Sequence, residues 1–113
     1  MTRKNLDAML TYMADHIILR TTLAAEPLKG KAALRPVVQA LLNVVDKFDF
    51  REIMQGPRHV SWFFKVTVGS IQLDAMDYWL LNQEGLIQEV TVLWRPLPAI
   101  AAVNQILTGG NPP

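Results

Sequence analysis

Three long β-prone segments follow one another in the second half of the chain, with short turns between them. They are HVSWFFKVTV (59–68), IQLDAMDYWLL (71–81) and LIQEVTVLWRP (86–96). The intervening Gly69-Ser70 and Asn82–Gly85 have the composition of hairpin turns, and Gly85 can adopt a positive φ. Strands joined by such short turns pair antiparallel. These segments therefore predict an antiparallel sheet, with FDFREIMQ (48–55) as a further, weakly alternating strand.

The first half of the chain carries helical signals. Apolar residues at positions 6, 9, 10 and 13 have helical spacing and predict a short helix over roughly Lys4–Ala14. The β-branched segment His16–Leu23 then predicts a strand. A second helix is predicted from Lys31 onward, because apolar residues recur three and four positions apart as far as position 45. Pro36 lies inside it and predicts either a kink or a regular part that begins near Arg35.

Residues 99–107 predict a last short helix, and 108–113 a frayed tail. Helices combined with a run of antiparallel strands define an α+β fold, in which the helices lie on one face of a curved sheet and leave a cone. A chain of 113 residues supports one hydrophobic core, so we expect a single domain over residues 1–113. Half of the residues are hydrophobic and 19% are charged, against a typical ~25%. This apolar surplus indicates a lined cavity, burial by self-association, or both.

Charge and composition exclude several classes of partner. A net charge of +1 without a cluster of Lys and Arg argues against nucleic-acid binding. No apolar run reaches the ~18 residues of a membrane span, and the start of the chain does not read as a signal peptide. We therefore expect a soluble, cytoplasmic protein that does not bind membranes. The chain has no cysteine, which excludes disulfides and thiol catalysis, and we expect no cofactor.

Two segments resemble proteins of the nuclear transport factor 2-like superfamily. YMADHIILRTTLAAEPLKGKAAL (12–34) is similar to the region where an Ala-Asp pair opens the first strand and Lys-Gly or Arg-Gly precedes the long helix. LDAMDYWLLNQEGLIQEVTVLWRPL (73–97) resembles the closing hairpin, with an aspartate, alternating apolar residues and Asn-x-x-Gly-x-Ile. The resemblance covers about Leu10–Leu107. It is nearest to the SnoaL-like group, which includes polyketide cyclases, ketosteroid isomerase and limonene epoxide hydrolase relatives.

The resemblance implies a cystatin-like α+β fold, in which a curved mixed or antiparallel sheet wraps around helices as a conical barrel. It also implies an apolar pocket and, usually, a homodimer through the outer face of the sheet. The first helix is shorter here than in relatives, where it covers the cone, so we expect a shallow pocket, a pocket open to one side, or one capped by the partner chain.

The resemblance aligns Asp77 with a position that has a role in two branches of the superfamily. In isomerase-like members, the resemblance implies, an aspartate there points into the pocket and, held protonated, donates a hydrogen bond to a developing oxyanion. In epoxide-hydrolase-like members the same position carries a catalytic acid. The accompanying residues differ: Thr21 stands where the isomerase has its general base, and Ala75 where the hydrolase pattern has an arginine. The isomerase's pocket tyrosine would lie on the shortened first helix. Neither mechanism therefore transfers.

Strand alternation places Asp77 on the same face as Leu73, Ala75, Trp79 and Leu81, and we expect this face to point into the cone. The predicted ligand-binding set takes the matching positions of the other elements. It consists of Tyr12, Leu19, Thr21, Val60, Trp62, Phe64, Asp77, Trp79, Val90, Val92 and Trp94.

Asp77 is the candidate catalytic residue, and two interpretations of it stay open. In an apolar pocket, desolvation raises the pKa of a carboxyl group, which can then donate a hydrogen bond to a ligand or act as a general acid or base. Alternatively, Asp77 is a structural residue bonded to a tyrosine, a histidine or a backbone amide. The histidines, His16 and His59, lie at element boundaries and are weaker candidates. Without a spaced carboxylate motif they do not predict a metal site.

Phe63, Tyr78 and Leu93 fall on the opposite face of the predicted sheet. A sheet with apolar residues on both faces usually buries both, which favours a homodimer through the outer face. We therefore expect a homodimer that binds a small apolar molecule, with Asp77 as the polar anchor. Two alternatives remain. One is an isomerase-, cyclase- or epoxide-hydrolase-type enzyme that uses Asp77 as acid and base. The other is a protein-interaction module whose cavity is filled by Trp62, Trp79 and Trp94.

Overall fold

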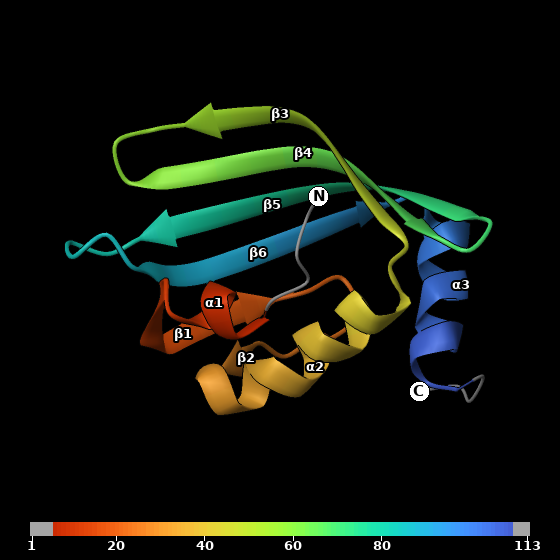
Figure 1. The fold of residues 1–113 in the computed structure, drawn as a ribbon, viewed down its shortest axis with the longest axis horizontal. Coiled ribbons are helices and arrows are strands. Elements are labelled where there is room, and N and C mark those ends of the chain that lie inside the picture. Colours follow the sequence, from red (N-terminus) through yellow and green to blue (C-terminus); the bar gives the residue numbers. More distant parts are fainter. Residues whose placement is uncertain (1–5, 110–113) are drawn as a thin grey trace.

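The computed structural model describes residues 6–109 and shows, within that range, one curved six-stranded sheet and three helices (Figure 1). In chain order the elements are α1 (Leu6–Leu10), β1 (Met13–Arg20), β2 (Leu28–Lys29), α2 (Lys31–Val44), β3 (Lys47–Gln55), β4 (His59–Val68), β5 (Ile71–Leu81), β6 (Ile87–Arg95) and α3 (Leu97–Leu107). The predicted α+β class is confirmed.

The strand order in the sheet is β2-β1-β6-β5-β4-β3. β1 and β6 pair parallel, and all other neighbours pair antiparallel. Among the described residues the sheet is open, with β2 and β3 at its two edges, so the cone does not close into a barrel. Figure 1 shows α1 and α2 against β1 and β6, and α3 at the end of the sheet near the β4–β5 turn, while β3 and β4 extend away from the helices.

The predicted strands of the second half are confirmed closely. β4 and β5 have the predicted bounds, and β6 differs by one residue at each end. The turn at Asn82 explains this accuracy: its Oδ1 accepts hydrogen bonds from the backbone N–H groups of Glu84 (2.9 Å) and Leu86 (3.0 Å), and Gly85 has φ 82°. A turn that is closed by one of its own side chains is specified locally, and it sets where β5 ends and where β6 begins.

The predicted first helix is too long, and the first strand begins earlier than expected. Within the described residues α1 ends at Leu10, because the N–H and hydroxyl groups of Thr11 both bond the carbonyl of Ala8 in a closing turn. Met13 is buried, but it is the first residue of β1 and does not belong to a helix. Met13 lies three positions after Leu10, which fits the period of a helix. The first inward residue of a strand that follows the helix can lie at the same separation in sequence. Residues 4–5 of the predicted helix and 110–113 of the predicted tail lie outside the described part of the chain.

α2 begins at Lys31 and runs through Pro36 without interruption, so its regular part starts four residues earlier than Arg35. Pro36 lies early in the helix, where its missing N–H costs one hydrogen bond, to the carbonyl four residues before it. α3 begins two residues earlier than predicted, with Pro98 in its first turn, where proline is tolerated. The two-residue β2 was not predicted, since it lies in a segment without a strand pattern.

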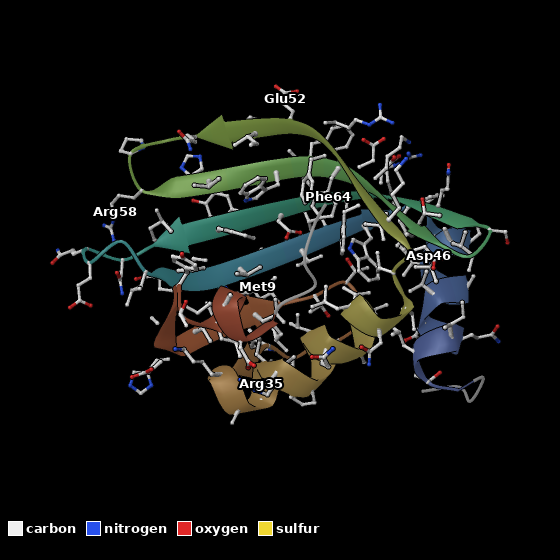
Figure 2. The ribbon with its side chains drawn as sticks, in the orientation of Figure 1. Met9, Arg35, Asp46, Glu52, Arg58 and Phe64 are labelled. Atoms are coloured by element: carbon white, nitrogen blue, oxygen red, sulfur yellow. The ribbon has the colours of Figure 1, made fainter. Side chains whose placement is uncertain are left out.

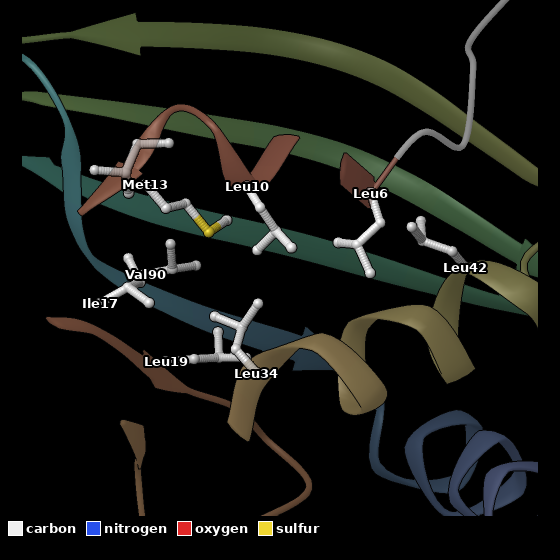
Figure 3. Packing of buried hydrophobic residues seen from close by; sticks show 9 residues of the cluster. Leu6, Leu10, Met13, Ile17, Leu19, Leu34, Leu42 and Val90 are labelled. Atoms are coloured by element: carbon white, nitrogen blue, oxygen red, sulfur yellow. The ribbon is translucent and has the colours of Figure 1, made fainter. Parts of the chain in front are cut away.

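Buried apolar residues form two clusters. The first cluster joins α1, β1, α2 and β6, and Figure 3 shows its side chains converging between the helices and the sheet; its buried members are Leu6, Leu10, Met13, Ile17, Leu19, Leu34, Leu42, Ile87 and Val90. The second cluster joins β4, β5 and α3 beyond the end of α2; its buried members are Val45, Phe64, Val66, Val68, Leu73, Ala75 and Val103. The helices therefore cover only part of the concave face.

Candidate functional site

The inward face of β5 carries Asp77, as strand alternation predicts. Leu73 and Ala75 are buried in the second cluster, and Trp79 packs against the first. Met76 and Tyr78, between these positions, are exposed on the other face. Asp77 thus lies on the concave face, between the two clusters.

Strand register fixes the neighbours of Asp77. On β4 its direct partner is Trp62, and on β6 it is Val92. Along its own strand the neighbours on the same face are Ala75 and Trp79. Four apolar or aromatic side chains therefore surround one carboxyl group.

Four rings on the concave face form a continuous aromatic wall, made of Phe50, Trp62, Phe64 and Trp79. The ring centroids of Trp62 and Trp79 are 5.2 Å apart. Phe50 contacts Trp62 edge-on, at 5.7 Å, and Phe64 at 5.1 Å. Figure 2 labels Phe64 on β4. Centroid distances of 4.5–7 Å are typical of favourable aromatic pairs, so the wall is packed.

The carboxyl group of Asp77 is buried within this wall. Nε1 of Trp79 donates a hydrogen bond to its Oδ2, at 3.3 Å. Oδ1 is also buried, and no residue in the range 6–109 offers it a hydrogen bond. Burial raises the pKa of Asp77 to about 6, because desolvation disfavours the charged form, while the Trp79 bond acts in the opposite direction. Asp77 therefore changes its charge just below neutral pH.

Trp62 carries a buried donor without a partner among the described residues. Its Nε1 is buried, and within the described part of the chain this N–H has no acceptor. Trp62 and Asp77 are direct cross-strand partners, so an unpaired donor and an unpaired acceptor belong to neighbouring side chains. Buried polar atoms are paired in the large majority of cases, and each exception calls for a specific explanation.

The other predicted ligand-binding residues divide into three groups. Leu19 and Val90 are buried in the first cluster beneath the helices, and Val92 packs against it. Trp94 packs against the second cluster, and Val60 is half-buried opposite Trp79. Thr21 lies just beyond β1, where its Oγ1 accepts the N–H of Leu23 at 3.1 Å.

Tyr12 departs from the expected position, since it is 67% exposed in the turn between α1 and β1. His16 is exposed, and His59 stacks on Tyr78 at 5.1 Å on the outer face. Among the described residues no group of three or more potential metal ligands occurs, and no helix is long and apolar enough to cross a membrane.

Phe50 and Ile53 of β3 also belong to the concave face but were not predicted. Both are half-exposed, at 49% and 52%, and Ile53 lies directly opposite Trp62. A register shift between Phe50 and Glu52 places these two inward residues three positions apart instead of two. This bulge explains the weak alternation of the segment. In the sequence, the Phe-x-Phe spacing at 48 and 50 is the pattern that predicts two aromatic side chains on one face of this strand.

A separate open groove of about 280 Å³ lies between α1 and α2. It is lined by Asp7, Leu10, Thr11, Lys31, Ala32 and Arg35, and it includes the ion pair of Arg35 with Asp7 at 2.8 Å. None of the predicted ligand-binding residues lines this groove, so it is distinct from the Asp77 site.

Neither a protein-family model nor a curated protein matches the sequence. Solved structures do match. A steroid delta-isomerase from Pseudomonas aeruginosa has a TM-score of 0.87 and 20% identity, over 95% of this chain and 80% of its own. An uncharacterised protein with a cystatin-like fold from Silicibacter pomeroyi has a TM-score of 0.87 and 21% identity, over 94% and 75%. A SnoaL-like protein of unknown function from Burkholderia thailandensis has a TM-score of 0.71 and 15% identity, over 81% and 82%.

These likenesses place the fold in the class of curved α+β sheets with helices on the concave face. More narrowly, the fold is that of nuclear transport factor 2-like and SnoaL-like proteins, as the resemblance implied.

Proposed function

We propose that this protein binds a small apolar molecule on the concave face of its sheet, with Asp77 as the polar anchor. The observation that carries the proposal is the buried carboxyl group of Asp77, set among the aromatic wall with Oδ1 unpaired by any described residue. Small-molecule sites typically combine apolar and aromatic walls with a few polar groups that orient the ligand. The steroid delta-isomerase of similar fold, named for a small apolar substrate, supports the proposal.

A thermal-shift screen of steroids, terpenoids and fatty acids tests this function. At least one compound is expected to raise the Tm of the wild type, because a ligand at a hundred times its Kd stabilises the native state by about 2.7 kcal/mol. Asp77→Ala is expected to lose most of that shift. The control is Asp74→Ala, on the same strand but the opposite face, where Asp74 pairs with Lys65 and Arg95. A ligand that shifts the Tm of Asp77→Ala and of the wild type equally would contradict the anchor role.

Binding is favoured over acid–base catalysis by the surroundings of Asp77. The side-chain group that bonds Asp77 is the indole N–H of Trp79, which does not take up or release a proton near neutral pH. An enzyme of the isomerase, cyclase or epoxide-hydrolase type would need a second group that does. Thr21, which stands at the isomerase base position, is also bonded within its own turn.

The contact between the rings of Trp62 and Trp79 favours a second candidate function, a protein-interaction module with a cavity filled by side chains. The two functions differ in the screen. The interaction module is expected to give no Tm shift with any of the three compound classes.

We also propose that two copies associate through the outer face of the sheet. Phe63, Met76 and Leu93 lie in register across β4, β5 and β6 and form an outer apolar row. All three are exposed, Leu93 most of all at 61%, and Tyr78 lies beside them. Next to this row the ion pairs of Asp74 with Lys65 and Arg95 form a polar border. An apolar centre with a polar margin is the usual anatomy of a protein interface.

Leu93→Glu is expected to convert the dimer into a monomer, because it places a charge at the most exposed position of the outer apolar row. Size-exclusion chromatography with light scattering measures the change, from twice the 12.7 kDa chain mass to that mass alone. Leu97→Glu, at a 76% exposed leucine of α3 outside the row, is the control and is expected to stay dimeric. A wild type that elutes as a monomer at high concentration would remove the dimer proposal.

A further inference from the structure

We propose, resting on the function proposed above, that the ligand carries a hydroxyl group that donates to Oδ1 of Asp77 and accepts from Nε1–H of Trp62. The inference adds a chemical class to the site: an apolar alcohol or phenol. It uses the two buried polar atoms for which residues 6–109 provide no partner.

Both atoms belong to residues that are direct cross-strand partners on the concave face. Trp62 and Asp77 are directly opposite each other on β4 and β5, and opposed residues of antiparallel strands have Cβ atoms about 4.5–5.5 Å apart. Each atom exposes less than 1 Å² to solvent. Oδ2, the other carboxyl oxygen, already accepts the N–H of Trp79. Oδ1 is therefore the oxygen left for a ligand.

The chemistry of the two atoms selects the ligand group. An indole N–H can only donate, and an ionised carboxylate oxygen can only accept. A hydroxyl group does both through one atom, so it satisfies both partners at once. A ketone or ether accepts from Trp62 but places a lone pair against Oδ1. An ammonium group donates to Asp77 but leaves the Trp62 N–H unpaired. A hydrocarbon leaves both unpaired, at a cost in free energy.

A ligand can reach the two buried atoms from the β3 edge of the sheet. Because both atoms are covered, a ligand must part the rings of the aromatic wall. Phe50 is the most exposed ring of the wall, at 49%, and it meets Trp62 edge-on at an interplanar angle of 64°. It lies on β3, an edge strand with a neighbour on one side only. Movement of Phe50 opens the side of Trp62, and it also loosens the contact of Phe50 with Phe64 of the second cluster, whose ring centroid lies 5.1 Å away.

Three probes with one skeleton test the inference by isothermal titration calorimetry at pH 7.5. 2-Naphthol both donates and accepts, 2-methoxynaphthalene only accepts, and naphthalene does neither. The wild type is expected to bind 2-naphthol about tenfold more tightly than either of the others, the effect of one to two net hydrogen bonds.

Trp62→Phe, which keeps a ring and removes the N–H, is expected to reduce the preference for 2-naphthol to about threefold. Asp77→Leu, which removes the acceptor and keeps an apolar filling, is expected to reduce it at least as far. Ser61→Ala is the control, because Ser61 adjoins Trp62 but faces the other side of the sheet opposite Tyr78. It is expected to keep the full preference.

The outcomes separate this inference from the function on which it rests. If the wild type binds all three probes equally, the apolar site stands and the hydroxyl preference is overturned. The assignment of the hydroxyl group to Trp62 and Asp77 is overturned if the preference survives unchanged in both Trp62→Phe and Asp77→Leu. If none of the three probes binds, both the inference and the proposed apolar site are contradicted.

Discussion

Asp77→Asn is expected to stabilise the protein at pH 7.5 by about 3 kcal/mol and to leave its stability nearly unchanged below pH 4. Burial raises the pKa of Asp77 from 3.8 to about 6, and a shift of one unit corresponds to about 1.4 kcal/mol. Asparagine has nearly the same shape, keeps an oxygen for the N–H of Trp79, and carries no charge to desolvate. Urea unfolding of both proteins at several pH values measures the difference.

The sign follows from proton binding. Between about pH 4 and pH 6 the native state keeps the proton of Asp77 while the unfolded state has released it. The native state therefore binds more protons, and stability falls as pH rises through this window. The loss is complete above the pKa of the folded state, so the advantage of Asp77→Asn grows from pH 4 to about pH 7 and is then constant.

Asp74→Asn provides a control of opposite sign. Hydrogen bonds from Lys65 and Arg95 lower the pKa of Asp74, so its ionised form is favoured in the folded protein. Its contribution is present above the pKa of the unfolded state and is lost as pH falls, and the substitution is expected to reduce stability at neutral pH. A stability difference between wild type and Asp77→Asn that does not change with pH would contradict the burial of an ionisable Asp77.

Leu34→Ala is expected to reduce the free energy of unfolding by about 3 kcal/mol, within the ~2–5 kcal/mol range of buried leucine truncations. Leu34 is 1% exposed on α2 and lies in the first cluster with Ile17 and Leu19 of β1 (Figure 3). Removing its side chain leaves a cavity where the helix packs on the sheet. Urea unfolding measures the loss.

Val37→Ala is the matched control on the same helix, because Val37 is 42% exposed and is expected to cost well under 1 kcal/mol. Equal losses for the two variants would mean that α2 does not pack on β1 through Leu34. The residues beneath the proposed ligand site would then be different, since Trp79 and Val92 of that site pack against the same cluster.

Local sequence patterns predict much of the site. The alternation of β5 placed Asp77 and Trp79 on one face, because side chains of a strand change sides with every residue. The pairing of Trp62 with Asp77 is also implied by a local feature: the two-residue turn at Gly69-Ser70 sets Val68 opposite Ile71, and the register follows from there. Tyr12 shows the limit, since a residue in a turn has no period that fixes its direction.

The sequence by itself determined the three central strands, their turns and the face on which Asp77 lies, because period-two alternation and turn chemistry are local. Only the tertiary structure decided the parallel pairing of β1 with β6, the bulge that brings Phe50 and Ile53 beside Trp62, and the part of the concave face that the helices cover. It also decided that Trp79 bonds one oxygen of Asp77 and leaves the other unpaired within the described residues. The strand pairing, the bulge and the helix cover depend on contacts between separate segments. The bond of Trp79 to Asp77 joins residues two positions apart on β5, but it depends on side-chain rotamers, which strand alternation does not encode.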